Sequence, residues 1–420
     1  MPPYDVIILG AGPAGLALAA ELAGRARVLV LERGELGRTG ATWYSYADRA
    51  HDHGLDDAIA FRTDHLLFQS PNYTHRMVDD CVVLDHHKVL ATWIGRARAG
   101  GAELVQGEYR SHSAQRDGVT VHASSGSYRA RLLVDCTGPS SPIVREHDLI
   151  RRKDAWVLSG ARVRLPEPLA APEIAYLPLN DDANTYVGIH PFSADELNIY
   201  VFQGQSDTLG DPEALTPLFR ETLARMYPSA EVVEPLGGRI TSGVLRRYAL
   251  PRVIFFGAAG MMNPEAIGMG FNEILRQVRG FGDRLVAALD EDRLDQRHLE
   301  QVALSVRDRE VMHFQRIIGA FSLHFVKAKS KWDGGVRWLN ALGPESKVWM
   351  RNELTLDWIR RATLKLHGAV PVRETLQMIP PKDLLFIADQ AARFVGQTVR
   401  HQAARGVASL RQRLAERFTG

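Results

Sequence analysis

Residues 4–33 read YDVIILGAGPAGLALAAELAGRARVLVLER, and this stretch decides the fold. Val6–Leu9 is a short apolar run, typical of a strand buried in a parallel sheet. Three glycines spaced G-x-G-x-x-G follow it, then a helix that starts at Pro13, and then a second apolar run at Val28–Leu31. This order predicts a βαβ unit that binds a dinucleotide, because glycines alone are common but this whole context is not.

Each glycine of the motif has its own physical task. Gly10 allows a sharp turn after the first strand, and Gly12 lets a pyrophosphate come close to the backbone. Gly15 lets the helix pack tightly on the strand. Pro13 and Ala14 open the helix, whose free N–H groups and positive dipole end are expected to face the phosphates.

The second strand ends in Glu32 and Arg33. A carboxylate at this position can accept hydrogen bonds from both hydroxyls of an adenosine ribose. The sequence therefore predicts Glu32, with Arg33 beside it, at the adenosine end of the cofactor site.

Composition sets the broad class. The chain has 420 residues and a net charge of +2, which gives no bulk preference for nucleic acid. Cys81 and Cys136 are its only cysteines, so we expect no disulfide framework and a reducing, cytoplasmic setting. No signal segment or membrane-length apolar run is evident, although peripheral membrane contact stays open, as do monomer and homodimer. The triplet 51–53 (His-Asp-His) has no third ligand at a recognisable spacing, so no metal site is expected.

Two later segments indicate which dinucleotide is bound. Residues 131–144 (RLLVDCTGPSSPIV) form an apolar strand that runs into Gly138, and they resemble the "ATG"-type strand of many flavoproteins. Residues 251–275 (PRVIFFGAAGMMNPEAIGMGFNEIL) resemble the flavin-contacting segment of aromatic hydroxylases, with its G-x-G-x-N part. The resemblance implies FAD, and adds these cofactor-binding residues: Gly257, Ala258, Gly268, Gly270, Phe271 and Asn272. An ordinary glycine-rich turn between strand and helix is the alternative for the second segment.

The layout as a whole resembles the flavoprotein superfamily of lycopene cyclases, geranylgeranyl reductases and aromatic-ring hydroxylases. It is most similar to the lycopene cyclase branch. Residues 42–45 (TWYS), 190–202 (HPFSADELNIYVF) and 258–264 (AAGMMNP) resemble stretches of those cyclases. The implied fold is α/β, a Rossmann-like FAD-binding domain with an inserted, mostly antiparallel sheet and a helical C-terminal region.

Three positions depart from the family pattern. The aspartate that contacts the ribityl chain in the family falls at Ala258, and an arginine before the Leu90 helix is replaced by His87 or Lys88. The paired glutamates of the cyclases fall near Ile199–Phe202, where no carboxylate stands. This last departure weighs against lycopene cyclisation.

The rest of the chain fits this layout. Residues 86–100 predict a helix with one apolar face, and several short apolar runs between 154 and 204 predict the strands of the substrate domain. The expected domains are a cofactor domain (1–41, 86–148 and 249–290), a substrate domain (42–85 and 149–248) and a helical region (291–420).

Candidate catalytic residues follow from the same layout. Glu265 lies in the turn that resembles the flavin-contacting one, where partial burial would raise its pKa and make it an acid or base. His190 and Tyr200 fall on a predicted pocket wall, as a proton carrier and a hydrogen-bond donor. A solvated glutamate, a structural histidine and a packed tyrosine are the alternatives.

Trp43 and Tyr44 are expected to line an aromatic substrate pocket, or else to be core residues. Two function classes remain open. In the first, an FAD-dependent monooxygenase or oxidase acts on a hydrophobic polyene, terpenoid or polyketide-like molecule in natural-product biosynthesis, with NAD(P)H as a transient reductant. In the second, the enzyme is a non-redox cyclase similar to lycopene cyclases.

Overall fold

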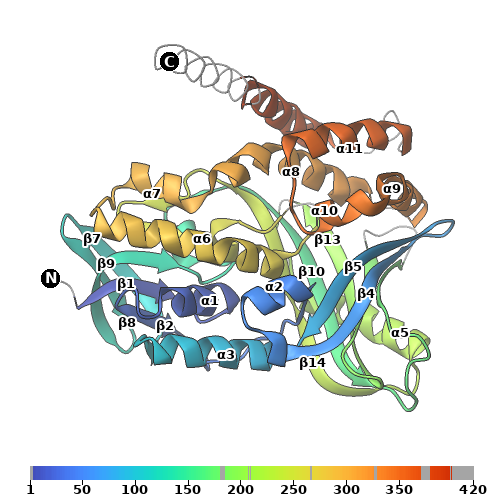
Figure 1. Cartoon of the computed structure of the whole chain (residues 1–420), viewed down its shortest axis with the longest axis horizontal. Coiled ribbons are helices and arrows are strands. Elements are labelled where there is room, and N and C mark those ends of the chain that lie inside the picture. The colour runs from blue at the N-terminus through green and yellow to red at the C-terminus, as the bar shows by residue number, and fades with distance from the viewer. Residues whose placement is uncertain are drawn as a thin grey trace, which may run out of the picture.

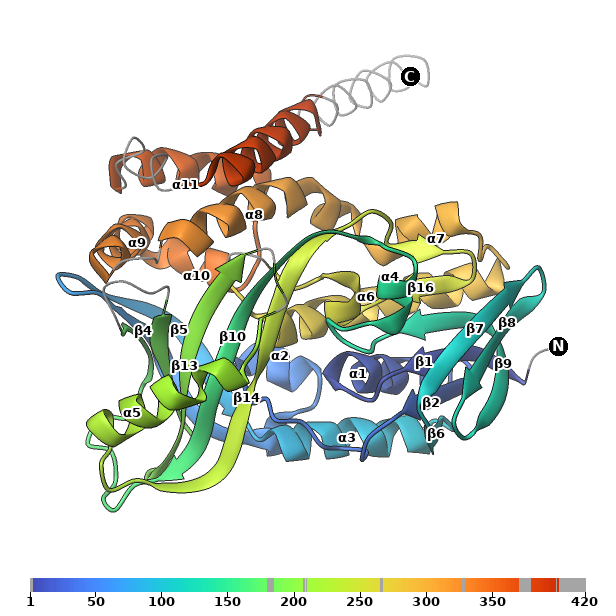
Figure 2. The same cartoon turned by 180° about the vertical axis from the view of Figure 1, so that it is seen from behind.

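A computed structural model describes residues 3–179, 185–206, 208, 210–264, 267–325, 329–369, 379–397 and 399. Two large sheets lie beside each other, with helices covering one face of the first sheet and one edge of the second (Figures 1 and 2). The predicted α/β class with a helical C-terminal region is confirmed.

The first sheet has eight strands, and its main path runs β15-β16-β9-β1-β2-β6. Its members are β1 (Tyr4–Leu9), β2 (Val28–Glu32), β6 (Glu103–Gln106), β7 (Tyr109–Gln115), β8 (Gly118–Ala123), β9 (Gly126–Asp135), β15 (Ala249–Leu250) and β16 (Val253–Phe255). β1 pairs in parallel with β2 on one side and with β9 on the other. The strand order therefore reverses at β1, and in open parallel sheets this switch point is where ligands bind.

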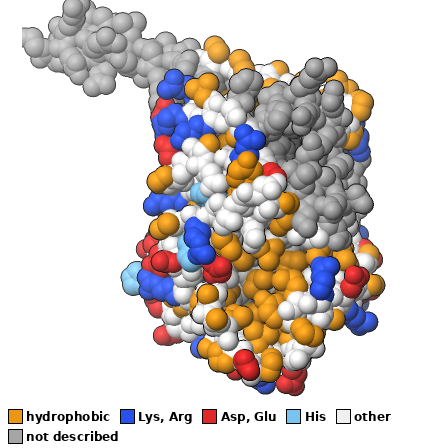
Figure 3. Space-filling view, turned by 90° about the vertical axis from the view of Figure 1, so that its right-hand side faces the viewer, with side chains coloured by type: hydrophobic (Ala, Val, Ile, Leu, Met, Phe, Trp, Pro, Cys, Tyr) orange, Lys and Arg blue, Asp and Glu red, His pale blue; other side chains and the backbone are white. Residues whose placement is uncertain are grey.

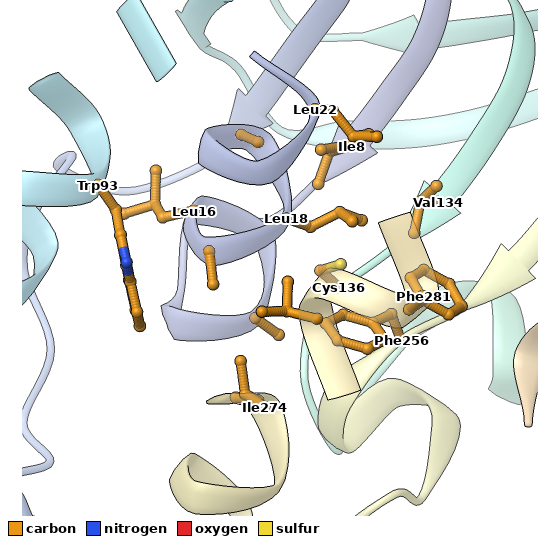
Figure 4. Close-up of a cluster of buried hydrophobic side chains, with 14 of the residues drawn as sticks. Ile8, Leu16, Leu18, Leu22, Trp93, Val134, Cys136, Phe256, Ile274 and Phe281 are labelled. Carbon is orange, nitrogen blue, oxygen red and sulfur yellow. The ribbon is translucent and has the colours of Figure 1, made fainter. Parts of the chain in front are cut away.

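Three helices cover one face of this sheet: α1 (Pro13–Leu22), α3 (His86–Ala99) and α6 (Gly270–Asp290). Figure 1 shows α1 between α3 and α6, and Figure 4 shows Leu16 and Leu18 packed among Trp93, Ile274 and Phe281. The sequence predicts one small-residue face of α1 against the sheet. In the structure the helix is buried on nearly all sides, because α3 and α6 flank it.

The second sheet also has eight strands, in the order β14-β10-β13-β12-β11-β4-β5-β3. Its members are β3 (Trp43–Tyr46), β4 (Ile59–Gln69), β5 (Thr74–Leu84), β10 (Ile150–Arg164), β11 (Ile174–Pro178), β12 (Thr185–Pro191), β13 (Glu196–Ser206) and β14 (Glu231–Leu245). All its pairs are antiparallel except β11 with β4, so the predicted, mostly antiparallel sheet is confirmed.

Alternation along the strands gives this sheet two different faces. Leu197, Ile199 and Val201 of β13 point toward α5 (Thr216–Met226), where Phe219 joins their cluster. The residues between them, such as Tyr200, point to the opposite face. Figure 3, which views the molecule from the side of α5 and the β4–β5 hairpin, shows apolar side chains gathered on part of this side.

The helical part packs on both sheets: its first helix contacts β15 and β16, and its third and fourth helices contact the β4–β5 hairpin. Its members are α7 (Gln296–Ala303), α8 (Val306–Phe325), α9 (Lys329–Leu342), α10 (Ser346–Met350) and α11 (Leu356–Ala369), with one more helix over 381–397. The shorter helices α2 (Ala47–Asp52) and α4 (Pro142–Glu146) lie in earlier connections. Among the described residues, no helix combines the length and apolar character needed to cross a bilayer.

The strands of the first sheet come from 4–32, 103–135 and 249–255, and those of the second from 43–84 and 150–245. The division of the chain into a cofactor domain, a substrate domain and a helical region remains a proposal. Cys81 and Cys136 are both buried free thiols.

Candidate active site

A single cavity of about 940 Å³ runs from the end of β1 to the inner face of the second sheet. The glycine-rich β1–α1 turn and the end of β2 line one end of it, and aromatic side chains line the other. The switch point of the first sheet thus opens directly into a chamber beneath the second sheet. We call these two parts the cradle and the aromatic chamber.

The glycine motif forms the cradle. A Cβ atom on Gly15 would lie 1.9 Å from the carbonyl oxygen of Gly10, so helix and turn touch there. Gly10 has φ +91°, and a Cβ atom on it would lie 2.8 Å from the oxygen of Cys136. A Cβ atom on Gly12, by contrast, would meet no atom within 4 Å, and this residue lines the cavity. The space that Gly12 leaves open is what the close approach of a pyrophosphate needs.

The first turn of α1 faces this space without a side-chain cap. Pro13 and Ala14 line the cavity, and the free N–H groups of this turn carry the positive end of the helix dipole. This end of the cavity is therefore suited to the phosphates of a dinucleotide.

Glu32 is held at the end of β2 by two backbone donors. Its Oε2 accepts from the Ala11 amide at 2.7 Å, and its Oε1 accepts from the Gly34 amide at 2.8 Å. Both Glu32 and Arg33 line the cavity. Each carboxylate oxygen keeps a lone pair, so the fixed carboxylate can still accept from ribose hydroxyls.

The strand β9 ends in a buried carboxylate that the sequence analysis missed. Asp135 accepts hydrogen bonds from the Thr137 amide at 2.9 Å and from the hydroxyls of Thr137 and Ser141 at 2.6 and 2.5 Å. Burial raises the pKa of Asp135 despite these donors. The contacts fix the loop that brings Gly138, at φ +84°, to the cavity. A charged residue closing an otherwise apolar strand was the available signal.

The start of α6 forms the third side of the cradle. Asn272 donates from Nδ2 to the Tyr44 carbonyl at 2.9 Å and accepts from the Ser45 hydroxyl at 2.6 Å. A Cβ atom on Gly270 would lie 2.1 Å from Asn263 Oδ1, so any larger residue here would have to displace the Asn263 side chain. The following predicted cofactor residues line the cavity here: Ala258, Gly268, Gly270, Phe271 and Asn272.

Two predicted cofactor residues, Gly15 and Gly257, do not line the cavity. Gly15 packs on the backbone of Gly10, and a Cβ atom on Gly257, at φ +66°, would lie 2.6 Å from Cβ of Ala14. Both glycines therefore pack against the β1–α1 segment that forms the cradle, and do not face the cavity. Glu265 lies outside the described residues.

The aromatic chamber is formed by rings from both sheet and helices. Tyr186 and Phe202 stack with their centroids 4.6 Å apart, and Phe68 stacks on Tyr176 at 5.4 Å. The other rings that line the chamber are Trp43, Tyr44, Trp156, Tyr200, Trp332, Trp338 and Trp349. Such a lining favours a flat, apolar molecule.

His190 lies among three tyrosines of the chamber. Its ring centroid is 5.4 Å from that of Tyr44, 5.6 Å from Tyr200 and 5.7 Å from Tyr176, whose hydroxyl lies 3.1 Å from Nε2. Burial lowers the pKa of His190 to about 3, so its imidazole is neutral at pH 7. His190 thus lines the cavity with an uncharged imidazole, and its catalytic role remains a prediction.

Tyr200 and Thr42 form a hydroxyl pair on the chamber wall. Their oxygens are 2.8 Å apart, and burial raises the pKa of Tyr200, so its hydroxyl stays protonated. Acidic side chains are confined to the other end, because the described carboxylates that line the cavity are Glu32, Glu35 and Glu108. The described chamber wall therefore offers neutral hydrogen-bonding groups and no carboxylic acid.

Comparison with known proteins agrees with this architecture. Residues 5–162 match the family described as lycopene cyclase protein. No curated protein sequence matches the chain.

Three solved structures show the same fold. A geranylgeranyl bacteriochlorophyll reductase-like protein from Thermoplasma acidophilum superposes with a TM-score of 0.69 at 14% identity, covering 90% of this chain and 99% of that one. Halogenase PltM in complex with phloroglucinol and FAD gives 0.59 at 16%, covering 95% and 96%. The p-nitrophenol 4-monooxygenase PnpA from Pseudomonas putida gives 0.61 at 17%, covering 86% and 97%.

The chain therefore has the same fold as these three proteins, and residues 5–162 are similar to the lycopene cyclase protein family.

Proposed function

We propose that the chain is an FAD-dependent oxidoreductase of the monooxygenase or oxidase type that acts on a flat, hydrophobic small molecule. A polyene, terpenoid or polyketide-like compound of natural-product biosynthesis is the proposed substrate class. The observation that supports this proposal is one continuous cavity that joins a dinucleotide cradle to an aromatic chamber, and the described wall of that chamber carries no carboxylic acid.

The residues of the cradle fit FAD. Gly12 leaves room for a pyrophosphate, the uncapped start of α1 faces it, and Glu32 is fixed where an adenosine ribose would lie. The start of α6 has no side-chain cap either, so its N–H groups can stabilise negative charge on the flavin ring. Ala258 lines the cavity without the polar contact that the family pattern has there, so backbone groups hold more of the ribityl chain in this proposal.

Bound FAD would supply two-electron redox chemistry, with NAD(P)H as a transient reductant and oxygen as the oxidant. The chain's own part is to bind, orient and keep the reacting centre dry. Trp43 and Tyr44 would form the wall between cofactor and substrate, and the Tyr200–Thr42 pair would orient a polar group of the substrate. Glu265 remains the proposed acid or base, and His190 a proposed neutral hydrogen-bonding partner.

A non-redox cyclase is the second candidate, and the match of residues 5–162 to lycopene cyclases favours it. Such a cyclase must protonate a double bond, which calls for a strong acid beside the substrate. Tyr200 and His190 do not fit that role, because burial raises the pKa of one and lowers that of the other. The described residues of the chamber therefore support the redox function better; Glu265, the proposed acid, lies outside them.

Measuring oxygen uptake against product formation distinguishes the redox function from the cyclase. Purified protein with FAD, NADH or NADPH, and candidate polyenes or aromatic polyketides should bleach its flavin absorbance and consume oxygen in step with product. Product formed in anaerobic samples, without net electron use, would overturn the redox proposal and support the cyclase. The Gly12→Ala variant serves as the control for background oxidation, since it is expected to fold with a filled cradle.

A further inference from the structure

A second group of polar side chains lies outside the cavity wall, between the two sheets. His86 and His87 open helix α3, and Glu234 stands near the start of β14, 147 residues after His87. Figures 1 and 2 both show the start of α3 beside β14. One ligand atom from each residue lies within 4.8 Å of the other two.

Two of the three distances between the ligand atoms agree with a tetrahedral ion. Glu234 Oε1 is 3.4 Å from His86 Nε2 and 3.3 Å from His87 Nε2. A zinc ion with bonds of about 2.0–2.1 Å in a tetrahedron separates its ligand atoms by about 3.3–3.4 Å.

The buried histidine supplies an independent sign of a missing partner. His86 is fully buried, and neither of its ring nitrogens has a hydrogen-bond partner among the described residues. Buried polar atoms in native proteins are nearly always paired, with protein, water or an ion. A neutral imidazole in this position can offer a lone pair from Nε2 to a cation.

The remaining surroundings also suit a metal. The other carboxylate oxygen of Glu234, Oε2, accepts from Arg162, which orients Oε1 toward the histidines as outer partners do in metal sites. The positive charge of Arg162 lowers the affinity for a cation, so we expect moderate binding. The His87 side chain is about half exposed, which gives an ion a way in from solvent.

We propose that His86, His87 and Glu234 bind one divalent transition-metal ion, zinc above all, in a tetrahedral site whose fourth ligand is a solvent molecule. Two imidazoles and one carboxylate are a common zinc ligand set. The ion would join α3 to β14 next to the cavity. The ion would also hold the His86 ring in place beside Trp43 of the cavity wall. The two ring centroids are 6.4 Å apart, in an edge-to-face arrangement.

The test uses tag-free, full-length protein that has been treated with chelator and then dialysed. Zn²⁺ titrated by calorimetry should bind at one ion per chain, and Co²⁺ should give the intense visible absorption of a tetrahedral site. Loss of one outer partner typically costs about 10–100-fold in affinity, and His87→Ala, which removes a ligand itself, should weaken binding at least that much.

His87→Ala keeps the Arg162–Glu234 pair, and thermal unfolding checks its fold. His51→Ala is the matched control, because His51 Nδ1 also lies near a carboxylate, 3.1 Å from Asp56, but no third ligand joins them among the described residues. Glu234→Gln serves as a second variant. Equal Zn²⁺ binding by wild type and His87→Ala, the absence of binding, or a weak octahedral Co²⁺ spectrum would each overturn the proposal.

Discussion

Trp43 and Phe271 lie face to face, with ring centroids 4.4 Å apart and planes 5° from parallel. Trp43 begins β3 of the second sheet, and Phe271 stands in the first turn of α6. Asn272 joins the same two segments through its bonds to Tyr44 and Ser45. The wall of the aromatic chamber and the proposed flavin-contacting turn are therefore one packed unit.

The stability of this packed unit should depend on the two hydrogen bonds of Asn272. In Asn272→Ala the buried Tyr44 carbonyl and Ser45 hydroxyl lose their partner, at a cost of about 1–3 kcal/mol for each unsatisfied group. We expect a clear loss of unfolding free energy in urea, together with weaker FAD retention. Asn272→Asp keeps an acceptor for the Ser45 hydroxyl but loses the donor to the Tyr44 carbonyl. Its unfolding free energy should therefore lie between those of the wild type and Asn272→Ala. Wild-type stability in both variants would contradict this account.

Gly12 and Gly15 should respond differently to the same added methyl group. Gly15→Ala places a Cβ atom 1.9 Å from the Gly10 oxygen, so the variant should unfold at a lower temperature even without cofactor. Gly12→Ala meets no protein atom within 4 Å, so its apoprotein should melt like the wild type. Its FAD affinity should still fall by about 10-fold or more, because the methyl group occupies the space for the pyrophosphate. Equal FAD affinity in wild type and Gly12→Ala would argue against the proposed cradle.

The buried His190 should make the protein sensitive to mild acid. Its pKa is about 3 in the folded chain, against an ordinary value of 6.5. Between these pH values His190 is therefore protonated in the unfolded chain and neutral in the folded chain. The stability that the neutral His190 contributes to the folded chain is fully present above pH 6.5 and is lost as the pH falls toward 3. From pH 7 to 5 the wild type should lose about 2 kcal/mol more stability than His190→Gln. Chemical unfolding at several pH values checks this, with the exposed His51→Gln as a control that should follow the wild type.

The part of the cradle formed by the βαβ unit could be predicted from the sequence because it is local. Strand, glycines, helix and terminal acid follow one another within residues 4–33, and each has a propensity that agrees with its place. The helix over 86–99 and the strands β10 to β13 were predicted for the same reason, from periodic apolar residues. The ligand roles of individual residues remain predictions.

Contacts between distant segments could not be predicted in this way. Nothing near Trp43 in the sequence indicates its stack on Phe271, and nothing near His87 indicates Glu234. The burial of α1 on nearly all sides likewise depends on two helices that come much later in the chain. Asp135 was missed for a different reason: its donors, Thr137 and Ser141, lie close in sequence, but only the apolar residues of the strand were used for the prediction.

The last prediction concerns Glu273, a buried carboxylate that helps hold α6 to the helical part. Its Oε2 accepts from Arg276 Nε at 3.0 Å and from Asn352 Nδ2 at 2.8 Å, while Oε1 accepts from Arg276 and Gln277. Arg276 also pairs with Asp308. Burial alone would raise the pKa of Glu273, but Arg276 and the hydrogen bonds lower it below the ordinary 4.5.

Glu273→Gln leaves the buried Arg276 with less compensation, and breaking a buried ion pair typically costs about 3–5 kcal/mol. Because the folded pKa is lowered, the stability that Glu273 contributes is present above pH 4.5 and is lost as the pH falls further, so the gap between variant and wild type should narrow in acid. Asp80→Asn is the matched control, since it breaks the exposed Arg62–Asp80 pair and should cost under about 1 kcal/mol. Urea unfolding at pH 7 and pH 4 measures the unfolding free energy of both variants. If both lose the same amount at pH 7, the buried Glu273–Arg276 pair stabilises the protein no more than an exposed pair does.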